Sequence, residues 1–238
     1  MNKVLISAAG RGTRMLDWSQ DRPKHMIEIA GHPFLYYLLH NLKQAGFNEM
    51  IMVVGYKKEK IEDFLRAYQQ QFKITVLNQF EILGEEKYGT VCPLVCAREI
   101  LHGQSFLSIY GDNLYAVEDL QNFSASESYN YVAGLAHDEP QKYGVLELDA
   151  EGYLKNILEK PVRPPTNLIN TGLYKFTSEV FDYLDQIQLS PRGEYELTDV
   201  INILAQKRRV KALPLRGQWL DLGRPEDIEK VAAYARSL

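Results

Sequence analysis

The chain has 238 residues, of which 45% are hydrophobic and 24% are charged, and its formal net charge is −4. These values are ordinary for a globular protein long enough to bury a full core, so they exclude disordered and fibrous classes. An acidic chain is not typical of proteins that bind nucleic acid in bulk, although a local basic pocket can still bind a small anion. The two cysteines, Cys92 and Cys96, make neither a disulfide framework nor a zinc-ligand set.

Short apolar segments alternate with amphipathic segments in the first half of the chain. Short apolar runs are typical of buried parallel strands, and the helices that join such strands carry an apolar stripe with helical spacing. Pro33 and Gly46 mark the start and the stop of the first helix. The alternation predicts a mostly parallel sheet that is covered on both faces. The predicted strands are residues 3–8, 50–54, 73–77 and 106–110, and the predicted helices are residues 33–45, 59–71 and 90–101.

The second half contains more predicted strands, with a hairpin turn at residues 149–152. Because no composition break marks a linker and no internal repeat is present, we expect one α/β domain with a mixed, mostly parallel sheet and no β-helix domain. The first apolar segment does not resemble a signal peptide and the run at 34–39 is too short to span a bilayer, so we expect a cytoplasmic protein with no membrane partner. The predicted strands are residues 131–136, 144–148, 153–158 and 168–176, and helices are expected near 178–184, 197–207 and 225–236.

A glycine-rich segment follows the first predicted strand, where residues 8–15 read Ala-Ala-Gly-Arg-Gly-Thr-Arg-Met. Glycines let backbone N–H groups approach phosphate oxygens, and Arg14 adds a planar charged fork for the same oxygens. The alternative is a tight turn with solvated arginines. A dinucleotide fingerprint needs a third glycine where Met15 stands, and the P-loop pattern is absent, so a nicotinamide-dependent oxidoreductase is not supported.

Two further residues in the first half suit phosphate and metal chemistry. Lys24 follows the rigid Pro23 and can meet phosphates held by the glycine-rich segment, the alternative being an ordinary surface lysine. Asp112 lies two positions after the end of the predicted strand at 106–110, at the crevice edge where open α/β sheets bind ligands. A carboxylate there suits Mg²⁺, which binds through one or two carboxylates and substrate phosphates. The alternative for Asp112 is a turn residue that caps the next helix.

Polar groups that suit a sugar phosphate gather in the second half. Neutral donors and one glutamate suit sugar hydroxyls, and Lys160 suits a phosphate. Each of these segments, taken alone, is also compatible with an ordinary strand end or turn. The segments are Tyr143-Gly144, Glu159-Lys160-Pro161, Asn170-Thr171-Gly172 and residues 219–223.

Together, these segments resemble the sugar-1-phosphate nucleotidylyltransferase family over residues 3–230, with residues 10–14 and Pro23-Lys24 as the signature. The later segments, including residues 190–199, look most like the pyrophosphorylase half of archaeal-type enzymes. The resemblance implies a Rossmann-like three-layer α/β/α domain with a β-rich sugar-binding part. It implies one nucleotidyltransferase domain over residues 1–238, with a nucleotide-binding half at about 1–115 and a sugar-binding half at about 116–238.

The resemblance also implies the reaction. A nucleoside triphosphate and a hexose 1-phosphate, either glucose 1-phosphate or N-acetylglucosamine 1-phosphate, would give a nucleoside-diphosphate sugar and pyrophosphate. Arg14 would hold the departing β- and γ-phosphates, and Lys24 the α-phosphate. Asp112 and Asp221 would hold Mg²⁺, which fits because two neighbouring carboxylates repel without a cation.

The remaining expected contacts follow from the same resemblance. Residues 190–199 are left out of the site, because Arg192 and Glu194 can simply fix the loop before a helix. The nucleotide is expected to contact Ala8, Ala9, Gly10, Gly12, Thr13, Gln79, Gly89 and Thr90, and the sugar phosphate Tyr143, Gly144, Glu159, Lys160 and Asn170.

Three departures from the family pattern bear on the choice of nucleotide. Ser7 stands where leucine is frequent, Asp17 stands where proline is common, and residues 80–88 form a longer stretch than expected. We favour UTP or dTTP. The alternatives are another acceptor, such as a mannose, heptose or alcohol phosphate, and a nucleotide-sugar sensor without turnover. A homo-oligomer is left open.

Overall fold

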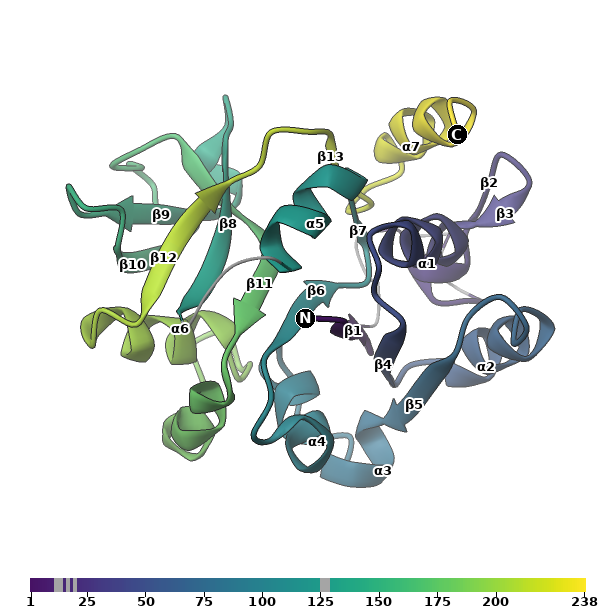
Figure 1. Cartoon of the computed structure of the whole chain (residues 1–238), viewed down its shortest axis with the longest axis horizontal. Helices are drawn as coiled ribbons and strands as arrows, with labels where there is room; N and C mark the ends of the chain where they lie inside the picture. Colours follow the sequence, from purple (N-terminus) through teal and green to yellow (C-terminus); the bar gives the residue numbers. More distant parts are fainter. Residues whose placement is uncertain (11–14, 16–17, 19–20, 125–128) are drawn as a thin grey trace.

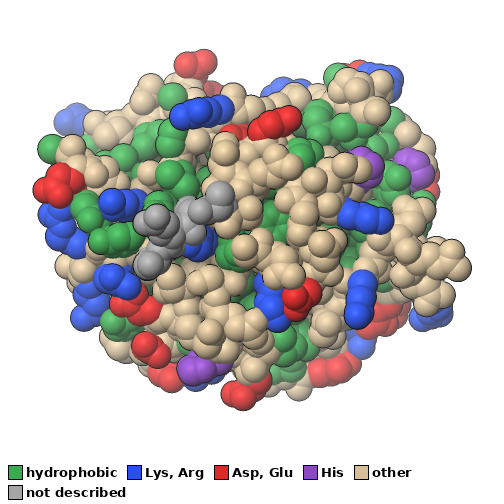
Figure 2. Space-filling view, viewed as in Figure 1, with side chains coloured by type: hydrophobic (Ala, Val, Ile, Leu, Met, Phe, Trp, Pro, Cys, Tyr) green, Lys and Arg blue, Asp and Glu red, His purple; other side chains and the backbone are tan. Residues whose placement is uncertain are grey.

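The computed structural model describes residues 1–10, 15, 18, 21–124 and 129–238, and Gly12, Thr13 and Arg14 lie outside them. A nine-stranded mixed sheet runs through the molecule (Figure 1). None of the helices in the described ranges is long and apolar enough to cross a bilayer. On the face shown in Figure 2, basic and acidic side chains are interspersed over the described surface, as suits a chain with a small net charge.

The first half of the chain builds a parallel block in the strand order β6-β1-β4-β5. Strand β1 lies inside this block and is paired on both sides, which explains its buried apolar run Val4-Leu5-Ile6. The strands of the block are β1 (Lys3–Ala8), β4 (Glu49–Val54), β5 (Ile74–Asn78) and β6 (Phe106–Tyr110). Two short strands, β2 (Glu28–Ile29) and β3 (His32–Pro33), pair with each other outside this block. The helices are η2 (Lys24–Met26), α1 (Phe34–Gln44), α2 (Lys58–Ala67), α3 (Gln79–Leu83) and α4 (Cys92–Leu101).

The second half extends the same sheet through β11, which pairs antiparallel with β6, β8 and β9. A separate two-stranded ladder joins β7 to β13. The strands are β7 (Asn113–Tyr115), β8 (Asn130–Ala136), β9 (Gly144–Leu148), β10 (Leu154–Glu159), β11 (Leu168–Phe176), β12 (Val210–Pro214) and β13 (Trp219–Asp221), and the helices are α5 (Val117–Ser124), η3 (Pro140–Lys142), η4 (Ser178–Gln186), α6 (Leu197–Gln206) and α7 (Asp227–Ala235).

Two hydrophobic cores lie on opposite faces of the sheet. Because side chains alternate along a strand, Val4 and Ile6 of β1 enter one core and Leu5 enters the other. The first core also contains side chains of α1, α2, α5 and α7, and the second contains side chains of α4, η4 and α6. Each fully buried Leu, Ile or Phe contributes about 1.5–3 kcal/mol. The predicted mixed α/β/α arrangement is therefore confirmed.

Some predicted boundaries are wrong in detail. The helix predicted at 59–71 ends at Ala67, and the one predicted from residue 90 begins at Cys92. Pro93 occupies its first turn, where a missing N–H costs no hydrogen bond. Helix α3 forms within the stretch treated as a long connection, because the Asn78 side chain accepts a hydrogen bond from the Phe80 N–H at 3.1 Å and caps it. Cys92 and Cys96 are buried free thiols.

Candidate active site

Two adjoining cavities open where the parallel strands end. The first cavity has a volume of about 320 Å³, and the second has a volume of about 340 Å³. Four residues line both of them: Thr90, Tyr110, Asp112 and Glu194. Since the first cavity lies against β1 and the second against β9, β10 and β11, a ligand that fills both would cross the junction of the two halves of the chain.

Lys24 and Asp112 form an ion pair at this junction, between η2 and the end of β6. Lys24 is only 9% exposed, so it is not an ordinary surface lysine. Burial of the Asp112 carboxyl raises its pKa, but the charge and hydrogen bond of Lys24, with smaller contributions from His25 and a backbone N–H, together lower the pKa below its usual value of 3.8. Asn113 donates from Nδ2 to the other Asp112 oxygen at 2.9 Å. Asp112 is therefore a fixed, ionised carboxylate and not a helix cap.

Asp221 lies beside Asp112 although the two are far apart in the sequence. The β7–β13 ladder sets Asp221 opposite Asn113, and the Leu222 N–H donates to the Asp112 carbonyl at 2.8 Å. Both carboxylates line the second cavity. Within the described ranges, no group of three or more His, Cys, Asp or Glu side chains is arranged to hold a metal ion. A pair of carboxylates suits Mg²⁺, which keeps waters and phosphates as its other ligands.

The glycine-rich segment is placed in part. Ala9 and Gly10 line the first cavity. Ala8 is fully buried in the first core and does not line that cavity, because its position on β1 turns its side chain to the opposite side. The predicted phosphate contacts of Gly12, Thr13 and Arg14 lie outside the described residues.

The turn at residues 88–91 forms another wall of the first cavity and is bound to the loop before α6. The Tyr195 N–H donates to the Tyr88 carbonyl at 3.0 Å, and the Val91 N–H donates to the Tyr195 carbonyl at 3.1 Å. Thr90 Oγ1 accepts from the Leu197 N–H at 2.8 Å. The predicted residues Gln79, at the start of α3, and Gly89 and Thr90, on this turn, therefore share the first cavity. The second half of the chain holds the turn in place.

Gly89 permits this close contact, because its φ is +145° and an added Cβ would lie 2.2 Å from the Tyr195 carbonyl oxygen. We expect Gly89→Ala to lower the free energy of unfolding by about 2–4 kcal/mol more than Gly31→Ala does. Gly31 is the matched control, since its φ is also positive, at +92°, but no atom lies within 4 Å of its added Cβ. Urea unfolding measures the stability of both variants. Equal losses of the free energy of unfolding in the two variants would show that the Tyr195 contact does not constrain the turn.

All five residues predicted for the sugar phosphate line the second cavity. Gly144 and Glu159 are paired across β9 and β10, and Lys160 follows with a left-handed φ of 44°. Asn170 donates to the Tyr174 hydroxyl at 2.7 Å, which fixes its amide. The set is Tyr143, Gly144, Glu159, Lys160 and Asn170.

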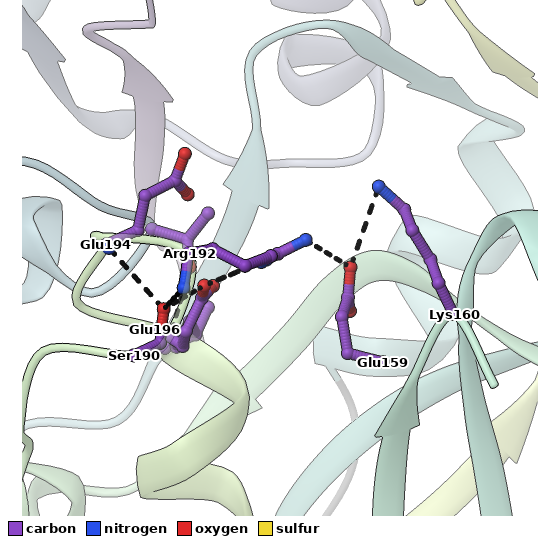
Figure 3. Close-up of polar contacts among 8 residues, drawn as sticks. Glu159, Lys160, Ser190, Arg192, Glu194 and Glu196 are labelled. Carbon is purple, nitrogen blue, oxygen red and sulfur yellow. Dashed lines mark hydrogen bonds and ion pairs between the residues drawn. The ribbon is translucent and has the colours of Figure 1, made fainter.

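The loop at residues 190–196 also reaches the second cavity, which the sequence did not lead us to expect. Arg192 donates from Nη1 to Glu159 at 3.0 Å, and Lys160 lies 3.8 Å from the same Glu159 oxygen. Figure 3 shows the two cations approaching Glu159 from different sides. Desolvation lowers the pKa of Arg192, but its hydrogen bond to Glu196 contributes to a net rise. The interpretation of Arg192 as a residue that only fixes its own loop is therefore incomplete.

His25 lies on the wall of the first cavity and is 1% exposed. Its Nδ1 has no hydrogen-bond partner among the described residues. Burial, followed by the charge of Lys24, lowers the pKa of His25 from 6.5 to about 4. The imidazole is therefore neutral in the folded protein at neutral pH.

The buried His25 makes the stability of the protein depend on pH. Between pH 6.5 and pH 4 the unfolded state binds a proton that the folded state does not, so the free energy of unfolding falls as the pH is lowered through this range. We expect His25 to account for a loss of about 2 kcal/mol between pH 7 and pH 5. Urea unfolding at several pH values should show that His25→Gln removes this component and that His102→Gln, at an exposed position, retains it. An unchanged slope in His25→Gln would contradict the assignment.

A crevice at the carboxyl ends of parallel strands, lined by glycines, lysines and carboxylates that include Lys24, Asp112 and Asp221, is typical of α/β proteins that bind phosphorylated small molecules. The chain belongs to the nucleotidyl transferase family, whose sequence profile matches residues 3–237. The expected family resemblance is thus confirmed.

Relatives agree with this assignment. A bifunctional sugar-1-phosphate nucleotidylyltransferase/acetyltransferase from Sulfurisphaera tokodaii is 36% identical over 98% of this chain and 55% of its own length. The bifunctional protein GlmU from Methanocaldococcus jannaschii is 36% identical over 97% of this chain and 53% of its own length, so the chain spans about half of these relatives. The UTP–glucose-1-phosphate uridylyltransferase AglF from Haloferax volcanii is 32% identical over 94% of this chain and 93% of its own length.

Solved structures show the same fold. A UDP-glucose pyrophosphorylase complexed with UDP-glucose superimposes with a TM-score of 0.85 at 24% identity over 100% of both chains. A UDP-glucose pyrophosphorylase from Acinetobacter baumanii superimposes with a TM-score of 0.82 at 22% identity, over 98% of this chain and 93% of its own.

Proposed function

We propose that this chain transfers a nucleotidyl group from a nucleoside triphosphate to a hexose 1-phosphate and releases pyrophosphate. The observation that carries the proposal is the convergence of Lys24, Asp112 and Asp221 where the first cavity meets the second. Membership of the nucleotidyl transferase family supports it. The nucleotide would occupy the first cavity, built mainly by residues 1–115, and the sugar phosphate the second, built mainly by residues 116–238.

The proposed step is an in-line displacement at the α-phosphorus. An oxygen of the sugar phosphate forms a bond to that phosphorus while the bond to the bridging oxygen of pyrophosphate breaks. The developing negative charge needs cations that are already in place. Lys24 would hold the α-phosphate and Arg14 the leaving phosphates. Asp112 and Asp221 would hold Mg²⁺, which supplies further charge neutralisation when it is bound.

The favoured substrates are UTP or dTTP with glucose 1-phosphate or N-acetylglucosamine 1-phosphate. The Haloferax volcanii relative is named for UTP and glucose 1-phosphate, which supports starting with that pair. Both substrates are phosphorylated metabolites, so we place the reaction in the cytoplasm.

One assay matrix tests the proposal. Four or five triphosphates are combined with a panel of sugar 1-phosphates and an alcohol phosphate in the presence of Mg²⁺, and pyrophosphate and nucleotide sugar are both measured. We expect equal amounts of the two products for a pyrimidine triphosphate with a hexose 1-phosphate. Tight binding of a nucleotide sugar with no product in any combination would instead identify a sensor, and turnover only with the alcohol phosphate would overturn the sugar assignment.

A further inference from the structure

Glu196 is a buried carboxylate at the start of α6 and is one of the residues that line the second cavity. Its residue is 7% exposed, and its Oε1 accepts three hydrogen bonds: from Ser190 Oγ at 3.1 Å, from Arg192 Nε at 3.2 Å and from Arg192 Nη2 at 2.8 Å. A buried carboxylate is costly unless it is paired and hydrogen-bonded. The guanidinium of Arg192 supplies the paired charge, so the two side chains fix each other.

Arg192 connects this buried carboxylate to the wall of the second cavity. Its side chain is 45% exposed, and a free arginine on a loop would lose much rotational freedom on being fixed. The planar guanidinium has several donors in one rigid fork, so it can bind Glu196 through Nε and Nη2 while Nη1 reaches Glu159 at 3.0 Å. Glu196 thus sets the direction in which Arg192 meets Glu159 (Figure 3).

The backbone on either side of Glu196 is fixed as well. Tyr195 is hydrogen-bonded to the turn at residues 88–91, and the Leu197 N–H donates to Thr90 Oγ1. The backbone beside Glu196 is therefore anchored, and the guanidinium of Arg192 is held through its side-chain contacts to Glu196 and Glu159. Because these backbone bonds do not involve the Glu196 carboxylate, a change of its charge leaves the turn of the first cavity in place.

We propose that Glu196 is a positioning residue for the sugar side of the site, and that it holds Arg192 against Glu159 so that this carboxylate is presented to the sugar in one orientation. The inference rests on the proposed function, in which Glu159 contacts the sugar. Without the hold on Arg192, Glu159 keeps, among the residues that the structure describes, the longer contact to Lys160. Sugar binding then weakens while nucleotide binding does not.

Glu196→Gln tests this, because it keeps the shape of the side chain and an oxygen for Ser190 but removes the charge. We expect the KM for glucose 1-phosphate to rise about tenfold, the loss expected for one charge-assisted hydrogen bond. The KM for the triphosphate and kcat should each stay within about twofold of the wild-type values, whereas a general destabilisation of the fold would change them as well. The matched control is Glu179→Gln, which removes a similar ion pair with Arg209 at 2.9 Å, away from both cavities.

A second readout does not depend on activity. The ¹⁵N resonance of the Arg192 Nε–H group can be identified by its loss in Arg192→Lys. In the wild type this resonance should be sharp and its proton slow to exchange with water. In Glu196→Gln the proton should exchange fast, and the resonance should move to the position of a freely rotating arginine. A wild-type-like resonance in Glu196→Gln overturns the positioning role, as does an unchanged KM for glucose 1-phosphate. If the wild type releases no pyrophosphate from any pair of substrates, the proposed function fails, while this resonance still decides whether Glu196 positions Arg192.

Discussion

Lys24→Met should lower kcat by about two to four orders of magnitude, the loss expected when a cation that meets developing charge is removed. The ammonium of Lys24 is held at the junction of the two cavities by Asp112, so it is in place before substrate arrives. Methionine keeps most of the apolar stem of lysine and leaves no large cavity. Steady-state pyrophosphate release measures the effect.

The loss must be separated from unfolding, because Lys24→Met leaves the Asp112 carboxylate buried without its partner. Breaking such a pair costs about 3–5 kcal/mol, so thermal unfolding should show a lower Tm with a single cooperative transition. Lys58→Met is the matched control, since it removes a lysine paired with Glu81 at 2.8 Å outside the site. Near-normal turnover in folded Lys24→Met would refute its role in charge neutralisation.

Asp112→Asn and Asp221→Asn should each lower turnover by about two to three orders of magnitude at ordinary Mg²⁺ concentrations. Each variant removes one carboxylate from the pair that faces the second cavity, and a neutral amide is a poor ligand for a hard cation. The Mg²⁺ concentration for half-maximal activity should rise by at least about tenfold in both. A titration of activity with Mg²⁺ measures this shift.

The double variant refines the assignment. If Asp112 and Asp221 hold one ion, the second substitution should lower turnover by a much smaller factor than the first, because the effects of residues that act as a unit are not additive. Asp185→Asn is the control, since Asp185 pairs with Arg98 at 2.9 Å on the exposed side of η4. Unchanged Mg²⁺ dependence in both single variants would remove the metal role from this pair of carboxylates.

The order of strands and helices was predictable because it depends on local patterns. Strand β1 has the bounds predicted from its apolar run, Lys3–Ala8, and β6 has those predicted for residues 106–110. The sharp turn at Asp149 and Gly152 was predictable for the same reason, since both residue types favour it. Helix α3 was not predicted, because the Asn78 side-chain cap, and not an apolar repeat, marks its start.

The partners within the site were less predictable. In the sequence alone, Lys24 is compatible with a surface lysine. In the fold, it pairs with Asp112, which lies 88 positions later in the sequence. Likewise Arg192 and Glu159 are 33 positions apart and meet only because α6 packs beside β10. The residue types were visible in the sequence, but which charge faces which depends on tertiary packing. The β7–β13 ladder that brings Asp221 to Asp112 is too short to have a pattern of its own.

Crystals soaked with Mn²⁺ and a non-hydrolysable UTP analogue would show directly whether Lys24, Asp112 and Asp221 form one site, because anomalous scattering locates the ion. We expect an Mn²⁺ peak at about 2.1 Å from carboxylate oxygens of Asp112 and Asp221, with the analogue in the first cavity and its α-phosphate beside Lys24. An ion that binds elsewhere, or an analogue whose phosphates lie away from Lys24, would contradict it.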